Sequence, residues 1–180
     1  MQKRFGSLNA HAIRTELVRA GLLLVAFETL RGQLEHKLRG FFADDFQNFV
    51  ALPSEEYRRQ VLSRHKSSFV AAALWYVDQG VLVAEDVPTL ERIRSHRIDV
   101  AHELPNYLFD PASRLDVGLL EVSQRYIDTL SMYWATVWAS CDPAFDKVDL
   151  DTADIQPAAS LVMKYLLDSV HDLDPQQDGG

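Results

Sequence analysis

The sequence has a single cysteine, Cys141, and no long run of hydrophobic residues. One cysteine excludes an intramolecular disulfide and any multi-cysteine zinc site, and it is compatible with a reducing compartment, so we predict a cytoplasmic protein. The longest apolar run, Ala20–Phe27, is too short to cross a bilayer. The first residues are charged and lack the apolar stretch of a signal peptide. We therefore expect no membrane partner.

Motifs for nucleotides and metals are also missing. No glycine-rich phosphate loop and no dinucleotide-binding glycine pattern occurs. His102-Glu103 begins a His-Glu-x-x-His zinc motif, but Asn106 holds the place of the second histidine. Pro105 would also break the helix that such a motif needs. We therefore predict no metal site and no cofactor.

Strand signals are scarce, whereas helical signals recur along the whole chain. No Asn-Gly or Asp-Gly turn separates alternating apolar runs. The length of 180 residues suits one domain, and 47% hydrophobic with 24% charged residues is typical of a soluble globular protein. We predict an all-α fold, an up-and-down bundle of four main helices plus a shorter C-terminal helix. It forms one domain over 1–173, followed by a disordered tail at 174–180.

Apolar residues at three- to four-residue steps place the helices. Ser54 followed by two glutamates is typical of a helix start, Gly80 of a helix end, and Pro105 is expected to end the third helix. The predicted helices cover 9–41, 53–80, 88–104, 116–140 and 157–171. The segments 43–52 and 106–116 are read as irregular connectors.

The net charge of -8 argues, taken alone, against a protein that binds nucleic acid. The charge is unevenly distributed, however. Residues 142–180 contain nine aspartates and two lysines, a net of -7, which leaves only -1 for residues 1–141. An RNA substrate therefore stays compatible with the body of the chain.

The segment from Leu90 to Leu104 combines three arginines and two histidines with a short apolar stripe. Within it, Arg97 and His102 are separated by four residues, and Ala101 precedes the histidine. This pattern resembles the Arg-x4–6-His signature of HEPN-domain proteins. The resemblance implies a small helical bundle, commonly dimeric, and in many members a metal-independent ribonuclease of toxin or defence systems. Arg97 and His102 would then meet their counterparts in a cleft at a homodimer interface.

The chemistry of these two side chains suits RNA cleavage. An imidazole titrates near neutral pH and can take a proton from a 2′-hydroxyl, while a guanidinium can grip two phosphate oxygens. On an ideal helix Arg97 and His102 point about 140° apart. A bend near Pro105, the long arginine arm or a second protomer must close that gap.

Several neighbouring residues are assigned lesser roles. Arg94, His96 and Asp99 are auxiliary candidates, although His96 can also face the core and Asp99 can simply pair with His102 on one helix face. A second basic cluster contains Arg58, Arg59 and Lys66, which would extend an RNA-binding surface. The alternative for this cluster is the solvated face of a helix.

Three functions stay open from the sequence. The first is a HEPN-like, metal-independent endoribonuclease that acts as a homodimer, with RNA as substrate and an antitoxin or regulatory protein as a further partner. The second is a HEPN-like binding or regulatory dimer without catalysis, which is favoured by Ile98 at a position that is usually polar in active members. The third is an unrelated helical interaction protein.

Overall fold

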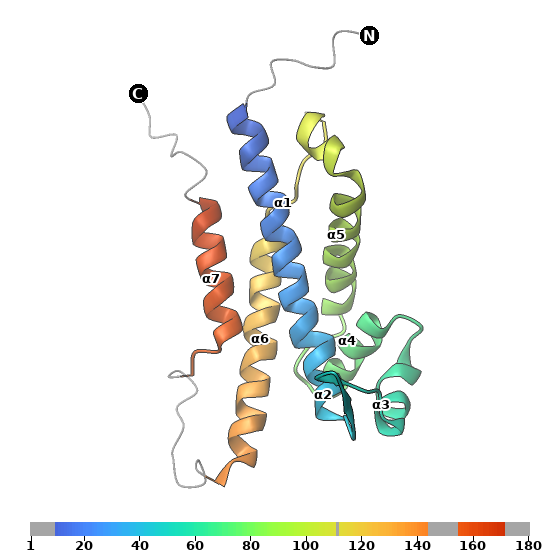
Figure 1. The fold of residues 1–180 in the computed structure, drawn as a ribbon. Coiled ribbons are helices and arrows are strands. Elements are labelled where there is room, and N and C mark those ends of the chain that lie inside the picture. Colours follow the sequence, from blue (N-terminus) through green and yellow to red (C-terminus); the bar gives the residue numbers. More distant parts are fainter. Residues whose placement is uncertain (1–9, 111, 144–154, 172–180) are drawn as a thin grey trace.

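The computed structural model describes residues 10–110, 112–143 and 155–171, and it is mostly helical in this part of the chain (Figure 1). The predicted tail 174–180 lies outside the described residues. None of the described helices combines the length and apolar composition needed to cross a membrane. The elements are α1 (Ala10–Arg31), η1 (Gly32–His36), α2 (Lys37–Phe41), β1 (Phe46–Gln47), β2 (Val50–Ala51), α3 (Glu55–Gln60), η2 (Leu62–Arg64), α4 (Ser68–Asp78), α5 (Asp86–Phe109), α6 (Gly118–Cys141) and α7 (Ala158–His171).

The first predicted helix is confirmed as a continuous unit that contains one irregular turn. The helical backbone passes from α1 through the π-helical η1 into α2, because Arg31 and Lys37 at the two junctions both keep helical φ and ψ. In η1 the Lys37 N–H donates to the Gly32 carbonyl, five residues back instead of four. The wider turn changes which side chains face the core at this end of the helix.

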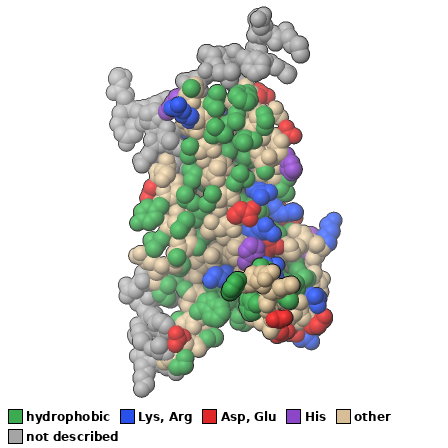
Figure 2. All heavy atoms as spheres, viewed as in Figure 1, with side chains coloured by type: hydrophobic (Ala, Val, Ile, Leu, Met, Phe, Trp, Pro, Cys, Tyr) green, Lys and Arg blue, Asp and Glu red, His purple; other side chains and the backbone are tan. Residues whose placement is uncertain are grey.

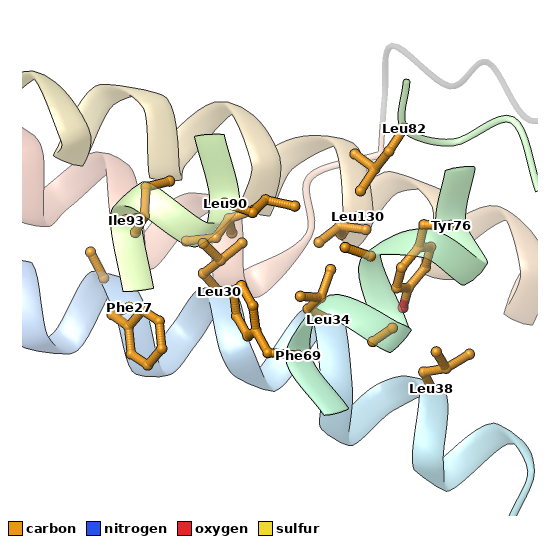
Figure 3. Packing of buried hydrophobic residues seen from close by; sticks show 14 of the residues in the cluster. Phe27, Leu30, Leu34, Leu38, Phe69, Tyr76, Leu82, Leu90, Ile93 and Leu130 are labelled. Atoms are coloured by element: carbon orange, nitrogen blue, oxygen red, sulfur yellow. The ribbon is translucent and has the colours of Figure 1, made fainter. Parts of the chain in front are cut away.

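The long helices pack side by side, with α1 in contact with α5, α6 and α7 (Figure 1). The ribbon shows that α5 runs antiparallel to α1, whereas α6 runs in the same direction as α1. Leu30 and Leu34 from the first helix belong to the same buried cluster as Ile93 of α5 and Leu130 of α6, and all four are fully buried (Figure 3). Burial of such side chains contributes about 1.5–3 kcal/mol each and supplies most of the drive for packing.

A buried hydroxyl joins three of the helical segments. The Tyr76 hydroxyl of α4 donates to the Gln33 carbonyl of η1 (3.1 Å) and accepts from the Trp134 indole N–H of α6 (2.9 Å). Both Tyr76 and Trp134 are buried, so neither group can turn to water. Burial also raises the pKa of Tyr76 well above its usual range, so the phenol stays protonated and keeps its donor.

The prediction of one helix over 53–80 is wrong, because the chain breaks between α3 and α4. After the short turn of η2, His65 adopts an extended conformation, and its Nδ1 atom accepts the Ser67 backbone N–H (3.0 Å). A continuing helix would have needed that N–H for its own ladder. Ser67 instead becomes the N-cap residue of α4, and Gly80 follows the end of α4 with a φ of +70°, as predicted for a C-terminal glycine.

The prediction that Pro105 ends the third helix is also wrong. The helix bends at Glu103 (φ -113°, ψ 23°) and continues to Phe109. Proline removes one backbone donor and its ring crowds the carbonyl four residues earlier, which bends this helix without stopping it. The residues 106–109, predicted as loop, are therefore helical.

The connector 43–52, predicted to be irregular, contains a small antiparallel hairpin. Phe46 pairs with Ala51 and Gln47 with Val50. The two loop residues, Asn48 and Phe49, have φ angles of 50° and 65°, as the two-residue turns of hairpins require. Glycine usually takes the second position, so the phenylalanine there hides the turn signal in the sequence.

Removing the Tyr76 hydroxyl should destabilise the protein. Tyr76→Phe keeps the ring but leaves the Trp134 N–H and the Gln33 carbonyl without their partner, so we expect a loss of about 1–3 kcal/mol in the free energy of unfolding. Urea denaturation measures this loss of free energy of unfolding. Tyr133→Phe is the control, because no hydrogen bond involves the Tyr133 hydroxyl in the described structure. Equal stability of the two variants would contradict the role of this hydroxyl.

Candidate functional site

A cleft of about 230 Å³ lies where α1 and η1 meet the start of α4 and the middle of α5. We call it the arginine cleft. Figure 2 shows one group of charged side chains just right of the middle of this face, next to hydrophobic side chains along α1. The polar residues that line the cleft are Glu28, Arg31, Glu35, Ser67, Ser68, Arg94 and Arg97.

Arg97 is fixed in the cleft by one ion pair and one aromatic ring. Its Nη2 atom donates to Glu28 Oε1 (2.9 Å), and its guanidinium carbon lies 5.3 Å from the centre of the Phe27 ring. Phe27 in turn stacks on Phe69 in the first turn of α4, with ring centres 5.7 Å apart. The Arg97 Nε atom is buried and has no hydrogen-bond partner among the described residues, so Glu28 does not use all of the hydrogen-bonding capacity of this side chain.

The charges in the arginine cleft do not cancel completely. Arg31 donates to Glu35 (2.8 Å) and to Glu28 (3.5 Å), so these two carboxylates hold Arg31 and Arg97. Contact with Glu35 raises the pKa of Arg31, which is therefore charged at every relevant pH. Arg94 also lines the cleft, and no carboxylate within the described ranges forms an ion pair with it. Three guanidinium groups and two carboxylates leave a net positive charge.

The N-terminus of α4 adds to this positive potential. Ser67 precedes the helix in an extended conformation, and its side chain makes no capping hydrogen bond. The first N–H groups of a helix have no partner within the helix, and they lie at the positive end of its dipole. With Arg94 and Arg97 on the facing wall, this end of α4 favours an anion such as a phosphate group.

His102 lies outside the arginine cleft of the same chain. It is exposed on α5, five residues beyond Arg97, and the bend of α5 follows it at Glu103. The segment between Arg97 and His102 is thus regular helix, and the two side chains leave it in directions about 140° apart. Asp99 is exposed too, and in the described part of the chain no hydrogen bond joins it to His102. Of the predicted residues, the cleft unites Arg94 and Arg97.

His96 forms a structural contact in this protein. Its Nε2 atom accepts the backbone N–H of Asp116 just before α6 (3.1 Å), and its ring meets Tyr107 edge to face. Burial lowers the pKa of His96, and this outweighs the carboxylates of Asp116 and Asp99, which act in the opposite direction. His96 therefore connects α5 to the start of α6 as a neutral imidazole.

The basic residues of the second cluster lie on and after α3, and all three are exposed. Arg58 pairs with Glu55 (2.7 Å) and Arg59 with Glu56 (2.5 Å), each three residues back on the same helix. Such pairs neutralise the charge locally and contribute little to stability. Lys66 directly precedes Ser67 and so lies next to the arginine cleft in the chain.

The residues that complete the arginine cleft were not predicted from the sequence. Glu28 and Arg31 come from the first helix, and Glu28 contacts Arg97 across 69 positions of the sequence. No local spacing encodes such a contact. The break at His65 is local in the sequence and creates the helix start at Ser67, but the pattern over 53–80 did not reveal it.

Two further searches, for a group of metal ligands and for similar known proteins, gave no result for the described residues and for the chain, respectively. Among residues 10–110, 112–143 and 155–171, no group of three His, Cys, Asp or Glu side chains is placed to hold a metal ion. Comparisons with protein-family models, with curated proteins and with solved structures found no match to the chain. The function is therefore inferred from the geometry of the site.

The His96 contact predicts a specific pH dependence of stability. Because its pKa is lower in the folded state than in the unfolded state, the unfolded chain binds more protons as the pH falls below about 6.5. The stabilisation is fully present above that pH and is lost as the pH falls towards the folded pKa, with a slope of at most about 1.4 kcal/mol per pH unit.

Urea unfolding at pH 7.5 and pH 5.5 measures this effect. The loss of stability between the two values should be smaller in His96→Gln than in the unmodified protein. His102→Gln controls for the loss of a histidine as such, since that side chain is exposed. An unchanged loss in His96→Gln would refute the assignment.

Proposed function

We propose that this protein is a HEPN-like, metal-independent endoribonuclease of a toxin or defence system and acts as a homodimer. Arg97 and Arg94 hold the phosphate backbone of RNA in the arginine cleft, and His102 transfers the proton. The proposal includes the up-and-down bundle of four main helices plus a shorter C-terminal helix that the helical pattern predicts, a cytoplasmic location and an antitoxin or regulatory protein as a further partner.

One observation carries the proposal. Arg94 faces an open cleft without a carboxylate partner among the described residues, beside Arg97 and the N-terminus of α4. Arginine and helix N-termini are the groups that proteins use most directly to bind phosphate oxygens. The cleft can therefore bind an anion without rearranging the backbone.

The proposed reaction needs only these side chains and the RNA. A neutral His102 takes the proton of a 2′-hydroxyl, and the resulting oxygen attacks the adjacent phosphorus. The bond from phosphorus to the 5′-oxygen breaks, and the protonated His102 passes the proton to that leaving oxygen, so a 2′,3′-cyclic phosphate and a 5′-hydroxyl result and His102 is restored. Arg97 stabilises the charge that develops on the phosphate oxygens.

RNA binding tests the cleft. Arg94→Ala should weaken binding of a single-stranded RNA oligonucleotide, measured by fluorescence anisotropy at several salt concentrations. The dependence of the binding constant on salt concentration should decrease by the contribution of about one phosphate contact. Glu28→Gln should strengthen binding, because it removes the carboxylate that occupies Arg97.

Arg92→Ala is the matched control for this measurement. It removes the same charge from the same helix, but Arg92 pairs with Asp116 (2.6 Å) and does not line the cleft. Equal weakening by Arg92→Ala and Arg94→Ala would mean that only the overall charge matters.

Cleavage tests the catalytic pair. With excess EDTA present, the unmodified protein should cleave RNA and leave cyclic phosphate ends, while Arg97→Ala and His102→Ala should each lose at least about 100-fold in rate. His36→Ala removes another exposed histidine and should retain the full rate. Full activity of His102→Ala would exclude the proposed mechanism.

A second candidate, a binding or regulatory dimer without catalysis, is favoured by the ion pair between Arg97 and Glu28. A catalytic arginine occupied by a carboxylate of its own chain is less free to stabilise a transition state. This candidate predicts RNA binding that survives His102→Ala and no cleavage by the unmodified protein.

A further inference from the structure

The outer face of α1 carries a solvent-exposed stripe that we call the α1 stripe. Its middle is apolar or small, and its two ends carry opposite charges. Leu17, Val18 and Val25 are 44%, 42% and 46% exposed, which is unusual for large aliphatic side chains. The stripe consists of Arg14, Leu17, Val18, Gly21, Val25 and Glu28, all exposed.

Helical periodicity places these residues on one face. Steps of three, four and seven residues keep them within about 60° of a common direction, opposite to the buried Leu23 and Leu30. Figure 2 shows hydrophobic side chains running along α1 on this face. At the centre, a Cβ atom added to Gly21 would meet nothing within 4 Å, so the space above it is open.

The α1 stripe is complementary to itself when one copy is turned around. Arg14 and Glu28 each lie seven residues from Gly21, on opposite sides. In an antiparallel pair centred on Gly21, Arg14 of each copy therefore faces Glu28 of the other, and Leu17 faces Val25. This is the pattern that a two-fold interface requires, because the same patch serves both subunits. An amphipathic helix for membrane surfaces would instead carry lysine or arginine along its polar face.

We infer that two copies of this chain associate through the α1 stripe, antiparallel about a two-fold axis at Gly21. This inference rests on the homodimer of the proposed function and names its surface. Glycine at the centre lets the two helix backbones approach closely. The opposite charges of Arg14 and Glu28 at the two ends favour the antiparallel orientation, since a parallel pair would place like charges together.

The two-fold axis also lies close to the level of His102. Because α5 runs antiparallel to α1 and Arg97 contacts Glu28, His102 lies about 7.5 Å further along α5, level with about residue 23 of α1. That is about 3 Å from the level of Gly21. The axis therefore brings both copies of His102 to nearly the same level along the direction of α1. A site that is shared by two subunits requires this arrangement.

The interface would also act on the arginine cleft. Glu28 already accepts from Arg97 with one oxygen and from Arg31 with the other. Arg14 of the partner subunit would add a third cation at this carboxylate and compete with Arg97 for it. Dimerisation would thus free Arg97 for a phosphate group.

Disulfide cross-linking tests the register directly. In a Cys141→Ser background, Gly21→Cys should form a disulfide-linked dimer under mild oxidation, seen on a non-reducing gel. Val25→Cys should not, because equivalent residues four positions from the axis are about 12 Å apart along the helices and a disulfide needs Cα atoms within about 7 Å. A mixture of Leu17→Cys and Val25→Cys chains should cross-link. Cross-linking of Val25→Cys alone, or none by Gly21→Cys, would overturn the inference.

Sedimentation velocity tests the association itself. Gly21→Leu should weaken the dimer at least tenfold without unfolding the subunit, since leucine favours a helix and the site is open. Arg14→Glu should weaken it comparably, whereas Arg125→Glu, an exposed arginine of α6, should not. A dimer that tolerates both α1 changes, or a monomeric unmodified protein, would overturn the inference.

The RNA assays separate this inference from the proposed function. A dimer that cross-links at Gly21 but never cleaves RNA supports the α1 surface and refutes the ribonuclease. If the protein cleaves RNA as a monomer, the α1 surface is refuted but the ribonuclease activity is supported. The same holds if it cleaves RNA and stays dimeric with Gly21→Leu and Arg14→Glu. Cleavage that disappears together with the dimer supports both.

Discussion

The hydroxyl of Tyr76 is the constraint on which the arrangement of the other parts depends. It is the one polar group at the centre of the described core that bonds to two other segments, the carbonyl of Gln33 and the indole of Trp134. Apolar contacts tolerate sliding, but a buried donor and acceptor must stay paired, so this hydroxyl fixes how α4 sits against η1 and α6. The first residue of α4 is thereby fixed as well, and with it the N-terminus that faces the arginine cleft.

The site follows from this placement through a short chain of contacts. Phe69 in the first turn of α4 stacks on Phe27, and Phe27 supports the guanidinium of Arg97. The cation is therefore positioned by packing as well as by its ion pair with Glu28, and it does not depend on the carboxylate alone. The Phe27 ring and Glu28 together leave part of the hydrogen-bonding capacity of Arg97 unused, so an oxygen ligand can still be bound. The arginine cleft is thus prepared for an anion by the same contacts that pack the helices.

Features that depend on interactions between residues close in the sequence were mostly predicted, whereas features that depend on distant residues were missed. The helical segments were predicted because their apolar periodicity is local, and Arg94 and Arg97 were found together because they share one turn of α5. The break after α3 was missed because it depends on a single contact between His65 and Ser67. The extension of α5 beyond Pro105 was missed because the proline bends this helix at Glu103 without ending it, and the hairpin turn uses phenylalanine where glycine is usual. Glu28 could not be predicted at all, since only the fold brings it to Arg97.

Glu28 gives the two proposals a common thermodynamic basis. It belongs both to the arginine cleft and to the α1 stripe, so a ligand on one surface changes the other. If Arg14 of the partner subunit draws this carboxylate away from Arg97, dimerisation strengthens phosphate binding, and by linkage a bound phosphate strengthens the dimer by the same factor. The coupling is limited by the energy of the ion pair between Arg97 and Glu28. That pair is partly exposed and so contributes at most about 1 kcal/mol, roughly a fivefold change in affinity. Glu28 therefore modulates the site by a modest factor and does not act as an all-or-none switch.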